Sequence, residues 1–346
     1  MKHLILKKDR FENFISLLTQ NHKVMAPVSK GFNNFSFQPV TKAAQISLNY
    51  IPTIIPPKKF FMPQYESFLE YDKAWGENMK AVVDSEDMVL FGVHTCDLAG
   101  IKALNLVFSD RPRDYNYLTR KNHITLIGLE CNGYCDEFAG CAMMNNHLPD
   151  GGYDLFFTDL DTFFFVEVST ILGDKIVETI PVFDEAKAEH HKALQNLREK
   201  KREIFKNETG VDYRELPVIL EETRDSEIWD EVGSKCLSCG NCTNVCPTCY
   251  CFNIEDDVNL DLKTGRRIRV WDSCQNETYA LVAGGENFRE ERSERQKHRF
   301  FKKFKYTVDR YGRVFCTGCG RCSRTCMAQI NLKETLKNLY EEMPVK

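Results

Sequence analysis

The spacing of the cysteines constrains this chain more than any other feature. Six cysteines fall within residues 236–251, CLSCGNCTNVCPTCYC, and a second run, CTGCGRCSRTC, occupies 316–326. Both runs contain the spacing C-x2-C-x2-C-x3-C, which is the bacterial pattern for a 4Fe–4S cluster. Three thiolates on one tight loop hold three corners of an iron–sulfur cube, and the fourth corner needs a cysteine from elsewhere. The sequence therefore predicts two cubes in the C-terminal third of the chain.

The ligands of the two cubes follow from an exchange between the runs, because the last cysteine of each run serves the other cube in two-cluster proteins. This exchange predicts two sets of four ligands, which are Cys236, Cys239, Cys242 and Cys326 for one cube, and Cys316, Cys319, Cys322 and Cys246 for the other. Gly240 and Gly320 follow the second cysteine of each run, where a glycine lets the backbone approach the cluster and point N–H groups at it. Zinc is the alternative, but zinc sites use paired ligands, usually two C-x2-C units or a mixture with histidine.

Four more cysteines lie in the first 150 residues, and we expect them to form a third centre. DMVLFGVH (87–94) and HITLIGLEC (123–131) are apolar enough to be buried strands. If these strands are parallel, the thiols that follow them emerge at the same carboxyl edge, where α/β sheets place their sites. Two further cysteines follow in a glycine-containing loop. The expected ligands are Cys96, Cys131, Cys135 and Cys141. A third 4Fe–4S cluster is favoured ahead of zinc, and free thiols are the remaining alternative.

The chain divides into three parts by composition. Residues 1–183 alternate strand and helix patterns, which predicts an α/β domain with a mostly parallel sheet. Residues 184–230 are expected to be a helical linker. Residues 231–346 hold 11 of the 15 cysteines and are expected to form a helical, bacterial-ferredoxin-like domain with two 4Fe–4S clusters.

Several local elements can be predicted in the first two parts. LAGIKALNLVF (98–108) has apolar residues at helical spacing, and Asp97 is in a position to cap that helix. YDLFFTDLDTFFFVEV (153–168) is typical of a hairpin that turns near residues 159–161. The charged, alanine-rich stretch 184–208 predicts one helix, capped by Asp184 and ending before the next glycine.

Composition excludes some classes of function. The net charge is −4 and the pI is near 6.1, so neither nucleic acid nor a membrane surface is expected as a partner. The start of the sequence has no secretory apolar segment, which favours a cytoplasmic location, where thiols stay reduced and dense cysteine indicates metal binding. The basic, aromatic segment 291–306 is expected to be a solvated helix or a docking face for an acidic partner, ahead of a nucleic-acid site.

Three cysteines of the C-terminal part fall outside the cluster pattern. They are Cys249, Cys251 and Cys274. We expect them to be structural thiols that pack as small apolar groups. Ligation of another centre and redox activity remain alternatives.

Several unrelated motifs together resemble one protein family. They are PPKKFF (56–61), VHTCDLAG (93–100), YDLFFTDL (153–160), CLSCGNCTNVCPTCYC (236–251), WDSCQ (271–275), LVAGGENFR (281–289) and CTGCGRCSRTC (316–326). In these motifs the chain resembles the sulfhydrogenase beta subunit family and, more distantly, the family of the A-type subunit of anaerobic sulfite reductase. The resemblance extends from about residue 25 to 335. The family also shares CPTCxC and WDSC, but it usually has a tight CxC in its N-terminal domain, where this chain spaces Cys131, Cys135 and Cys141 differently.

The resemblance implies an iron–sulfur electron-transfer subunit of a cytoplasmic multisubunit oxidoreductase. Such a protein relays electrons between two partner subunits. One is a flavin-containing NAD(P)H-oxidoreductase subunit. The other is a catalytic metal subunit of the nickel–iron hydrogenase or sirohaem sulfite reductase type. It carries out no covalent chemistry of its own. The alternative is a stand-alone iron–sulfur reductase that uses the N-terminal cysteine site as its active centre. A DNA-linked redox sensor using the basic segment is a third class of function.

Overall fold

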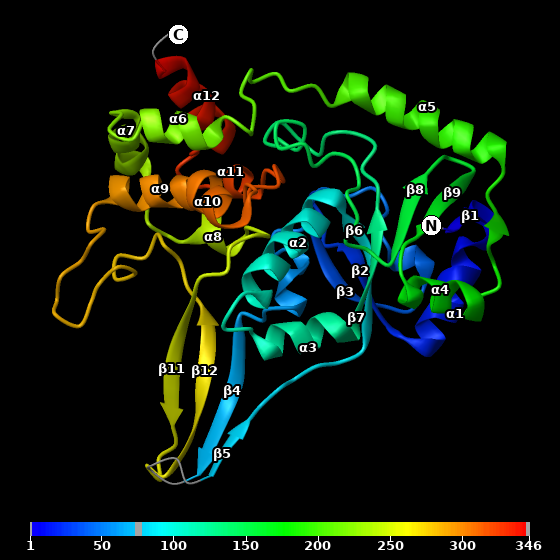
Figure 1. The fold of residues 1–346 in the computed structure, drawn as a ribbon. Helices are drawn as coiled ribbons and strands as arrows, with labels where there is room; N and C mark the ends of the chain where they lie inside the picture. The colour runs from blue at the N-terminus through cyan, green and yellow to red at the C-terminus, as the bar shows by residue number, and fades with distance from the viewer. Residues whose placement is uncertain (1, 73–77, 344–346) are drawn as a thin grey trace.

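The computed structural model describes residues 2–72 and 78–343 and combines two β-sheets with a C-terminal group of helices (Figure 1). Within those residues, no helix is both long enough and apolar enough to cross a bilayer. An eight-stranded sheet with strand order β10-β1-β9-β8-β7-β6-β2-β3 organises the N-terminal half. Its strands are β1 (Lys2–Lys7), β2 (Lys23–Ser29), β3 (Phe35–Val40), β6 (Met88–His94), β7 (Ile124–Leu129), β8 (Leu155–Asp159), β9 (Phe163–Val168) and β10 (Asp184–Glu185).

This large sheet is mixed, which corrects the expectation of a mostly parallel sheet. The pairs β2–β6, β6–β7 and β7–β8 are parallel, and the other four pairs are antiparallel. The antiparallel pairs arise because β8 and β9 form the predicted hairpin, β1 and then β10 extend the sheet beyond β9, and β3 joins it at the other end. The parallel centre confirms an α/β fold, and the strands predicted at 87–94 and 123–131 are confirmed as β6 and β7.

Helices cover both faces of the large sheet because its central strands bury alternate side chains on each side. Val89 and Phe91 of β6 pack in one core with α1 (Phe11–Asn21) and α4 (Ile171–Thr179). Leu90 of the same strand packs in a second core with α2 (Thr95–Ser109) and α3 (Tyr115–His123). Short 3-10 turns connect these elements, at η1 (Lys8–Arg10), η2 (Ala43–Gln45) and η3 (Pro57–Phe60).

Two predicted helix caps are wrong. Helix α2 begins at Thr95 with His94 as its N-cap, so Asp97 lies inside the first turn, where its carboxylate pairs with a distant arginine. The linker helix α5 runs from Ala188 to Ile204, and its N-cap is Lys187, whose backbone N–H donates to Nδ1 of His190 at 2.9 Å. Asp184 instead pairs with β1 as part of β10. In both cases the carboxylate pairs with an arginine from a distant part of the chain, Arg321 for Asp97 and Arg10 for Asp184.

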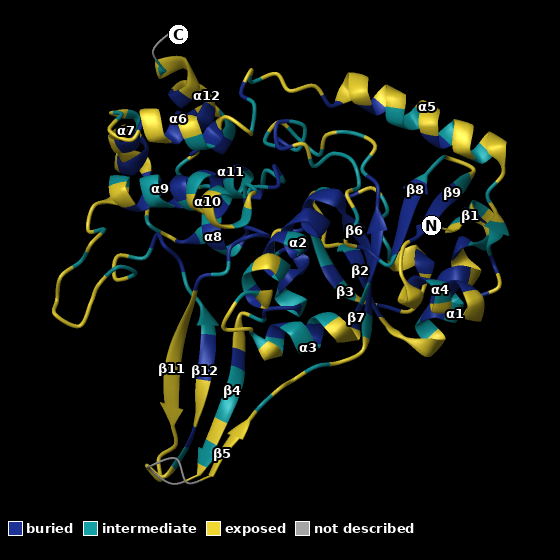
Figure 2. Cartoon of the chain, in the orientation of Figure 1, coloured by how far each residue is buried: buried dark blue, intermediate teal, exposed yellow. Residues whose placement is uncertain are grey.

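A second sheet joins parts of the chain that are far apart in sequence. Its four antiparallel strands have the order β11-β12-β4-β5, with β4 (Tyr65–Asp72), β5 (Asn78–Ala81), β11 (Phe252–Val258) and β12 (Thr264–Trp271). The sheet projects away from the rest of the chain, and Figure 2 shows that β11 is exposed along its whole length. It therefore connects the predicted N-terminal domain with the predicted C-terminal domain.

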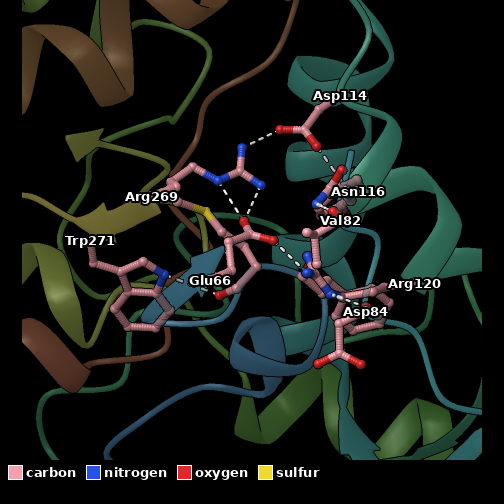
Figure 3. Close-up of polar contacts among 11 residues, drawn as sticks. Glu66, Val82, Asp84, Asp114, Asn116, Arg120, Arg269 and Trp271 are labelled. Atoms are coloured by element: carbon pink, nitrogen blue, oxygen red, sulfur yellow. Dashed lines mark hydrogen bonds and ion pairs between the residues drawn. The ribbon is translucent and has the colours of Figure 1, made fainter. Parts of the chain in front are cut away.

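A buried ion network fixes this second sheet to the α/β part (Figure 3). The carboxylate of Glu66 on β4 accepts hydrogen bonds from Arg269 on β12, at 2.5 Å from Nε, and from Arg120 on α3. Arg269 also pairs with Asp114, the N-cap of α3, and Trp271 donates its indole N–H to the carbonyl of Met62 at 3.0 Å. Glu66 is only 6% exposed, and its carboxylate is the counter-charge for the buried guanidinium groups of Arg120 and Arg269.

The C-terminal helices form a separate core around Trp229, Phe300, Phe304 and Leu336. The helices are α6 (Leu216–Glu222), α7 (Ile228–Lys235), α8 (Asn241–Asn244), α9 (Arg292–Phe301), the π-helical stretch η4 (Lys302–Tyr306), α10 (Thr307–Tyr311), α11 (Arg321–Arg324) and α12 (Leu332–Glu342). Helix α5 runs along the outside of the α/β part and leads the chain toward this group (Figure 1). The domain limits 1–183, 184–230 and 231–346 stay predictions.

Candidate iron–sulfur centres

The first run of cysteines surrounds a cavity with about 410 Å³ of empty space. Helix α7 ends at Cys236, and the short helix α8 follows Gly240, so the three cysteines of the run lie on one loop and one helical turn. The chain between Cys322 and Ile330 closes the opposite side of this cavity. Its cysteines are Cys236, Cys239, Cys242, Cys322 and Cys326. The cavity thus brings together the four thiols that the sequence assigned to one cube.

The second run surrounds a cavity with about 480 Å³ of empty space. The loop before α11 supplies Cys316 and Cys319, α11 itself supplies Cys322, and Cys246 of the first run reaches the same cavity with Pro247. Its cysteines are Cys246, Cys316, Cys319 and Cys322. Because Cys322 borders both cavities, the two centres are immediate neighbours. Both cavities therefore contain the exchanged fourth cysteine that the sequence pattern requires.

The two glycines selected from the sequence occupy equivalent positions. Gly240 has φ +71° and is the N-cap of α8, and Gly320 has φ +73° and is the N-cap of α11. Residues with a Cβ rarely adopt this left-handed conformation. A Cβ at Gly320 would also lie 2.9 Å from the backbone of Phe138. Glycine is needed there for the turn and for the close approach of another chain segment.

The basic segment 291–306 lies against the cysteines, so the expectation of a solvated helix is wrong. Its first half forms α9, whose Gln296 donates to Sγ of Cys236 at 2.9 Å. Its second half is π-helical, and the Lys303 ammonium lies 2.9 Å from Sγ of Cys246. Such π-helical turns are frequent at functional sites. Composition showed the positive charge of this segment but not that it faces sulfur.

Buried cations shape the electrostatics of these cavities. The Arg299 side chain lines the first cavity and is 3% exposed. A hydrogen bond from Cys249 and the ammonium of Lys303 hold the pKa of Cys246 well below its usual range. Burial raises the pKa of Cys242 and that of Cys316 to about 12. Nearby cations favour the thiolate, which is the form in which cysteine binds iron. Sulfur donors and buried positive charge together fit an anionic iron–sulfur cluster.

The N-terminal cysteines meet at the sheet edge that the sequence indicated. Strands β6 and β7 are parallel neighbours, and His94 pairs with Leu129 at their carboxyl ends. Cys96 and Cys131 each lie two positions beyond these paired residues. Burial, and then the nearby Cys135 and Cys141 thiols, raise the pKa of Cys131 well above its usual range. The structure therefore gathers the thiols of this loop close to the end of β7.

His94 is a packing residue. Its ring stacks on Tyr50 at 3.9 Å between centroids, and the side chain is 4% exposed. Burial lowers the pKa of His94 to about 3, which keeps the imidazole neutral. Within the described ranges, no three His, Cys, Asp or Glu side chains converge closely enough to hold a single metal ion.

The N-terminal cysteine loop packs directly on the second run. The backbone N–H of Gly140 donates to the carbonyl of Gly318 at 2.8 Å. A Cβ at Gly318 would lie 2.3 Å from the carbonyl oxygen of Gly140, so the two backbones touch. Asp136 on the loop also pairs with Arg324 of α11. The N-terminal thiols therefore lie beside the second cavity.

A buried ion pair connects the same two regions. Arg321 of α11 has no exposed surface, and its guanidinium binds both carboxylate oxygens of Asp97 at 2.7 and 2.8 Å. Asp97 lies in the first turn of α2, next to Cys96. The bidentate geometry fixes orientation as well as distance. No sequence pattern indicated this pair, because its partners are 224 positions apart.

Comparison with known proteins gives one domain family and one relative. Residues 235–330 match the 4Fe-4S dicluster domain family. The chain is 33% identical over 343 residues to sulfhydrogenase 2 subunit beta of Pyrococcus furiosus, and the alignment covers 99% of each chain. No solved structure matches.

Proposed function

Since this chain belongs to the sulfhydrogenase beta subunit family and contains a 4Fe-4S dicluster domain, we propose that it is the electron-relay subunit of a multisubunit oxidoreductase. In this proposal it connects a flavin-containing NAD(P)H-oxidoreductase subunit with a catalytic metal subunit of the hydrogenase or sulfite reductase type. The location is cytoplasmic, and neither nucleic acid nor a membrane takes part. The relay protein itself performs no catalysis.

The observation that carries this proposal is the pair of adjoining cavities that share Cys322. Each 4Fe–4S cluster, when bound, supplies a one-electron store. In the proposal one cube is held by Cys236, Cys239, Cys242 and Cys326, and the other by Cys316, Cys319, Cys322 and Cys246. Gly240 and Gly320 let the ligand loops close on them. The C-terminal domain then has the bacterial-ferredoxin-like arrangement.

The chain's own residues control the environment of these centres. The Lys303 ammonium and the Arg299 guanidinium offset the negative charge of the thiolates, which favours the reduced state. Burial of Cys236 and Cys246 excludes water from the ligand sulfurs. A dry, fixed environment reduces the reorganisation that accompanies electron transfer, so a relay needs little movement of the protein.

We also propose that Cys96, Cys131, Cys135 and Cys141 hold a third centre, a 4Fe–4S cluster ahead of zinc. Cys96 and Cys131 follow the adjacent carboxyl ends of β6 and β7. The loop that carries the other two thiols contacts the second ligand loop through Gly318. This contact supports a position for the third centre at the end of the relay.

The test uses the full chain prepared without oxygen. We expect at least eight irons per chain, and a reduced-state EPR spectrum broadened by interaction between neighbouring cubes, because the cavities adjoin. NAD(P)H alone should leave the isolated chain oxidised, and addition of the flavin subunit should reduce it. Zinc in place of iron would overturn the proposal. Turnover of sulfite, polysulfide or protons by the isolated chain with an artificial donor would instead favour the stand-alone reductase.

A further inference from the structure

A third cavity lies beside the two that hold the cysteine runs, and the cluster pattern does not account for it. It has about 300 Å³ of empty space. Three cysteines line it, from two segments of the chain that are more than 20 positions apart: Cys249, Cys251 and Cys274. Each of them is buried. These are the same three cysteines for which the sequence favoured apolar packing.

Positive charge converges on this cavity. The Lys302 ammonium lies 3.0 Å from Sγ of Cys251, and the Lys303 ammonium lies 3.4 Å from Sγ of Cys249. Arg299 lines the cavity as well. Among the described residues that line it there is no carboxylate. Buried ammonium and guanidinium groups need a negative partner, and among the described residues that line this cavity the cysteine sulfurs contact both ammonium groups. Apolar packing of neutral thiols does not explain this arrangement.

The cations also join this cavity to the other two. Lys303 lines both the second cavity and the third, and Arg299 lines both the first and the third. Cys249 follows Cys246 by three positions, and the Lys303 ammonium contacts both sulfurs, at 3.4 and 2.9 Å. The third cavity thus repeats the chemistry of its neighbours, which is cysteine sulfur lining an enclosed space beside a buried cation.

We propose that Cys249, Cys251 and Cys274 hold a further iron–sulfur cluster, next to the second cube. The three sulfurs line a cavity and, among the residues described, do not converge on one point, so the space suits a cluster and not a single ion. No fourth thiolate lines the cavity in the described part of the chain. Three thiolates match a three-iron cluster, or a four-iron cube whose last iron takes a ligand from outside the protein.

This centre exchanges single electrons with the second cube. One centre loses an electron as the other gains it, and no bond or proton changes. The exchange rests on the proposed relay function, whereas the presence of the cluster does not. With this centre the relay branches beside Cys246, so that electrons have a second exit from the protein.

The test measures iron and acid-labile sulfide in the full chain, purified without oxygen. The variant Cys251→Ser/Cys274→Ser leaves Cys249 in place because the Lys303 ammonium contacts both Cys249 and Cys246, the fourth ligand assigned to the second cube. We expect it to lose three or four irons per chain and to keep the coupled EPR spectrum of the two cubes. The matched control is Thr307→Val, which changes a buried residue lining the same cavity without removing sulfur, and which keeps all the iron. Iron and spectra unchanged in the double variant would overturn the proposal.

A second variant decides the question if the double variant does not fold. Cys131→Ser/Cys135→Ser/Cys141→Ser removes the N-terminal centre and leaves the third cavity untouched. If the inference is correct, about 11 or 12 irons per chain remain, where 11 indicates a three-iron cluster and 12 a four-iron cube. About eight irons would overturn this inference and leave the proposed relay standing. Fewer than eight would contradict the two-cube assignment itself, so the two failures are distinguishable.

Discussion

The cysteines of residues 236–326 and the four N-terminal cysteines reach their positions by different means. Each C-terminal run is a local unit, in which a loop passes through a left-handed glycine into a four-residue helix. The N-terminal thiols come from the ends of two strands and from a loop that rests on Gly318. The difference indicates that local spacing positions three cysteines of each C-terminal run, whereas the arrangement of the N-terminal thiols depends on contact between distant parts of the chain. Four predictions test this contrast.

The largest effect is expected where the two regions touch. Gly318→Ala would force a Cβ into a left-handed residue and to within 2.3 Å of the Gly140 carbonyl oxygen. Since both partners are backbone, we expect the second cube and the N-terminal centre to be lost together, about eight irons per chain. Iron analysis and EPR measure the loss.

Gly312 provides the matched control, because it has a similar φ of +68° but a Cβ added there would have no other atom within 4 Å. Gly312→Ala should retain all the iron. Full iron content in Gly318→Ala would show that the two regions are independent.

Removal of one N-terminal thiol should separate the regions. Cys141→Ser is expected to lose about four irons and to keep the coupled EPR spectrum of the two cubes, because Cys141 lies outside both C-terminal cavities. Cys322→Ser should disturb both cubes and remove the coupling, since Cys322 borders both cavities. Equal EPR spectra in these two variants would contradict the difference between the N-terminal thiols and the C-terminal runs.

The ion pair between α2 and α11 should contribute stability without holding iron directly. Asp97→Asn leaves the fully buried Arg321 without its counter-charge, so we expect a loss of about 3–5 kcal/mol in the free energy of unfolding. Anaerobic denaturant unfolding measures it. Asp110→Asn, which breaks an exposed pair with Arg310, is the control and should unfold like the unchanged chain. A stable Asp97→Asn protein would show that this contact does not hold the regions together.

The smallest effect concerns the potential of the second cube. Lys303→Met removes a positive charge 2.9 Å from Sγ of Cys246, which disfavours the reduced state. We expect the reduction potential to fall by roughly 60–130 mV, equivalent to a charged hydrogen bond of about 1.5–3 kcal/mol. Potentiometric EPR titration measures it. Lys305→Met, on the same π-helical stretch but paired with Asp309, should leave the potential unchanged.

Local patterns allowed much of this structure to be predicted. The C-x2-C-x2-C-x3-C spacing identified the members of both C-terminal cavities, because three ligands of each set lie within seven positions. Short continuous apolar runs indicated β6, β7 and the β8–β9 hairpin, which bury side chains on both faces of the sheet. Parallel neighbours then brought Cys96 close to Cys131.

Long-range pairs were not predictable from the same patterns. Asp97 and Asp184 resemble helix caps in the sequence. In the structure Asp97 pairs with the buried Arg321, and Asp184 lies on the edge strand β10. The basic segment 291–306 has the composition of a solvated helix, and only the tertiary structure shows that Lys303 and Arg299 face sulfur. A carboxylate or an ammonium is ambiguous in sequence because its partner, not its own chemistry, decides its role.

The second sheet has a consequence for how the polypeptide is made. Strand β4 leaves the ribosome long before β12, since Glu66 and Arg269 are 203 positions apart. Until β12 arrives, the β4 edge that it covers has open N–H and C=O groups, which are a template for pairing with other chains. Shielding of that edge by a chaperone during synthesis would raise the yield of folded protein. The second sheet cannot be completed before the cysteine-rich half has been synthesised.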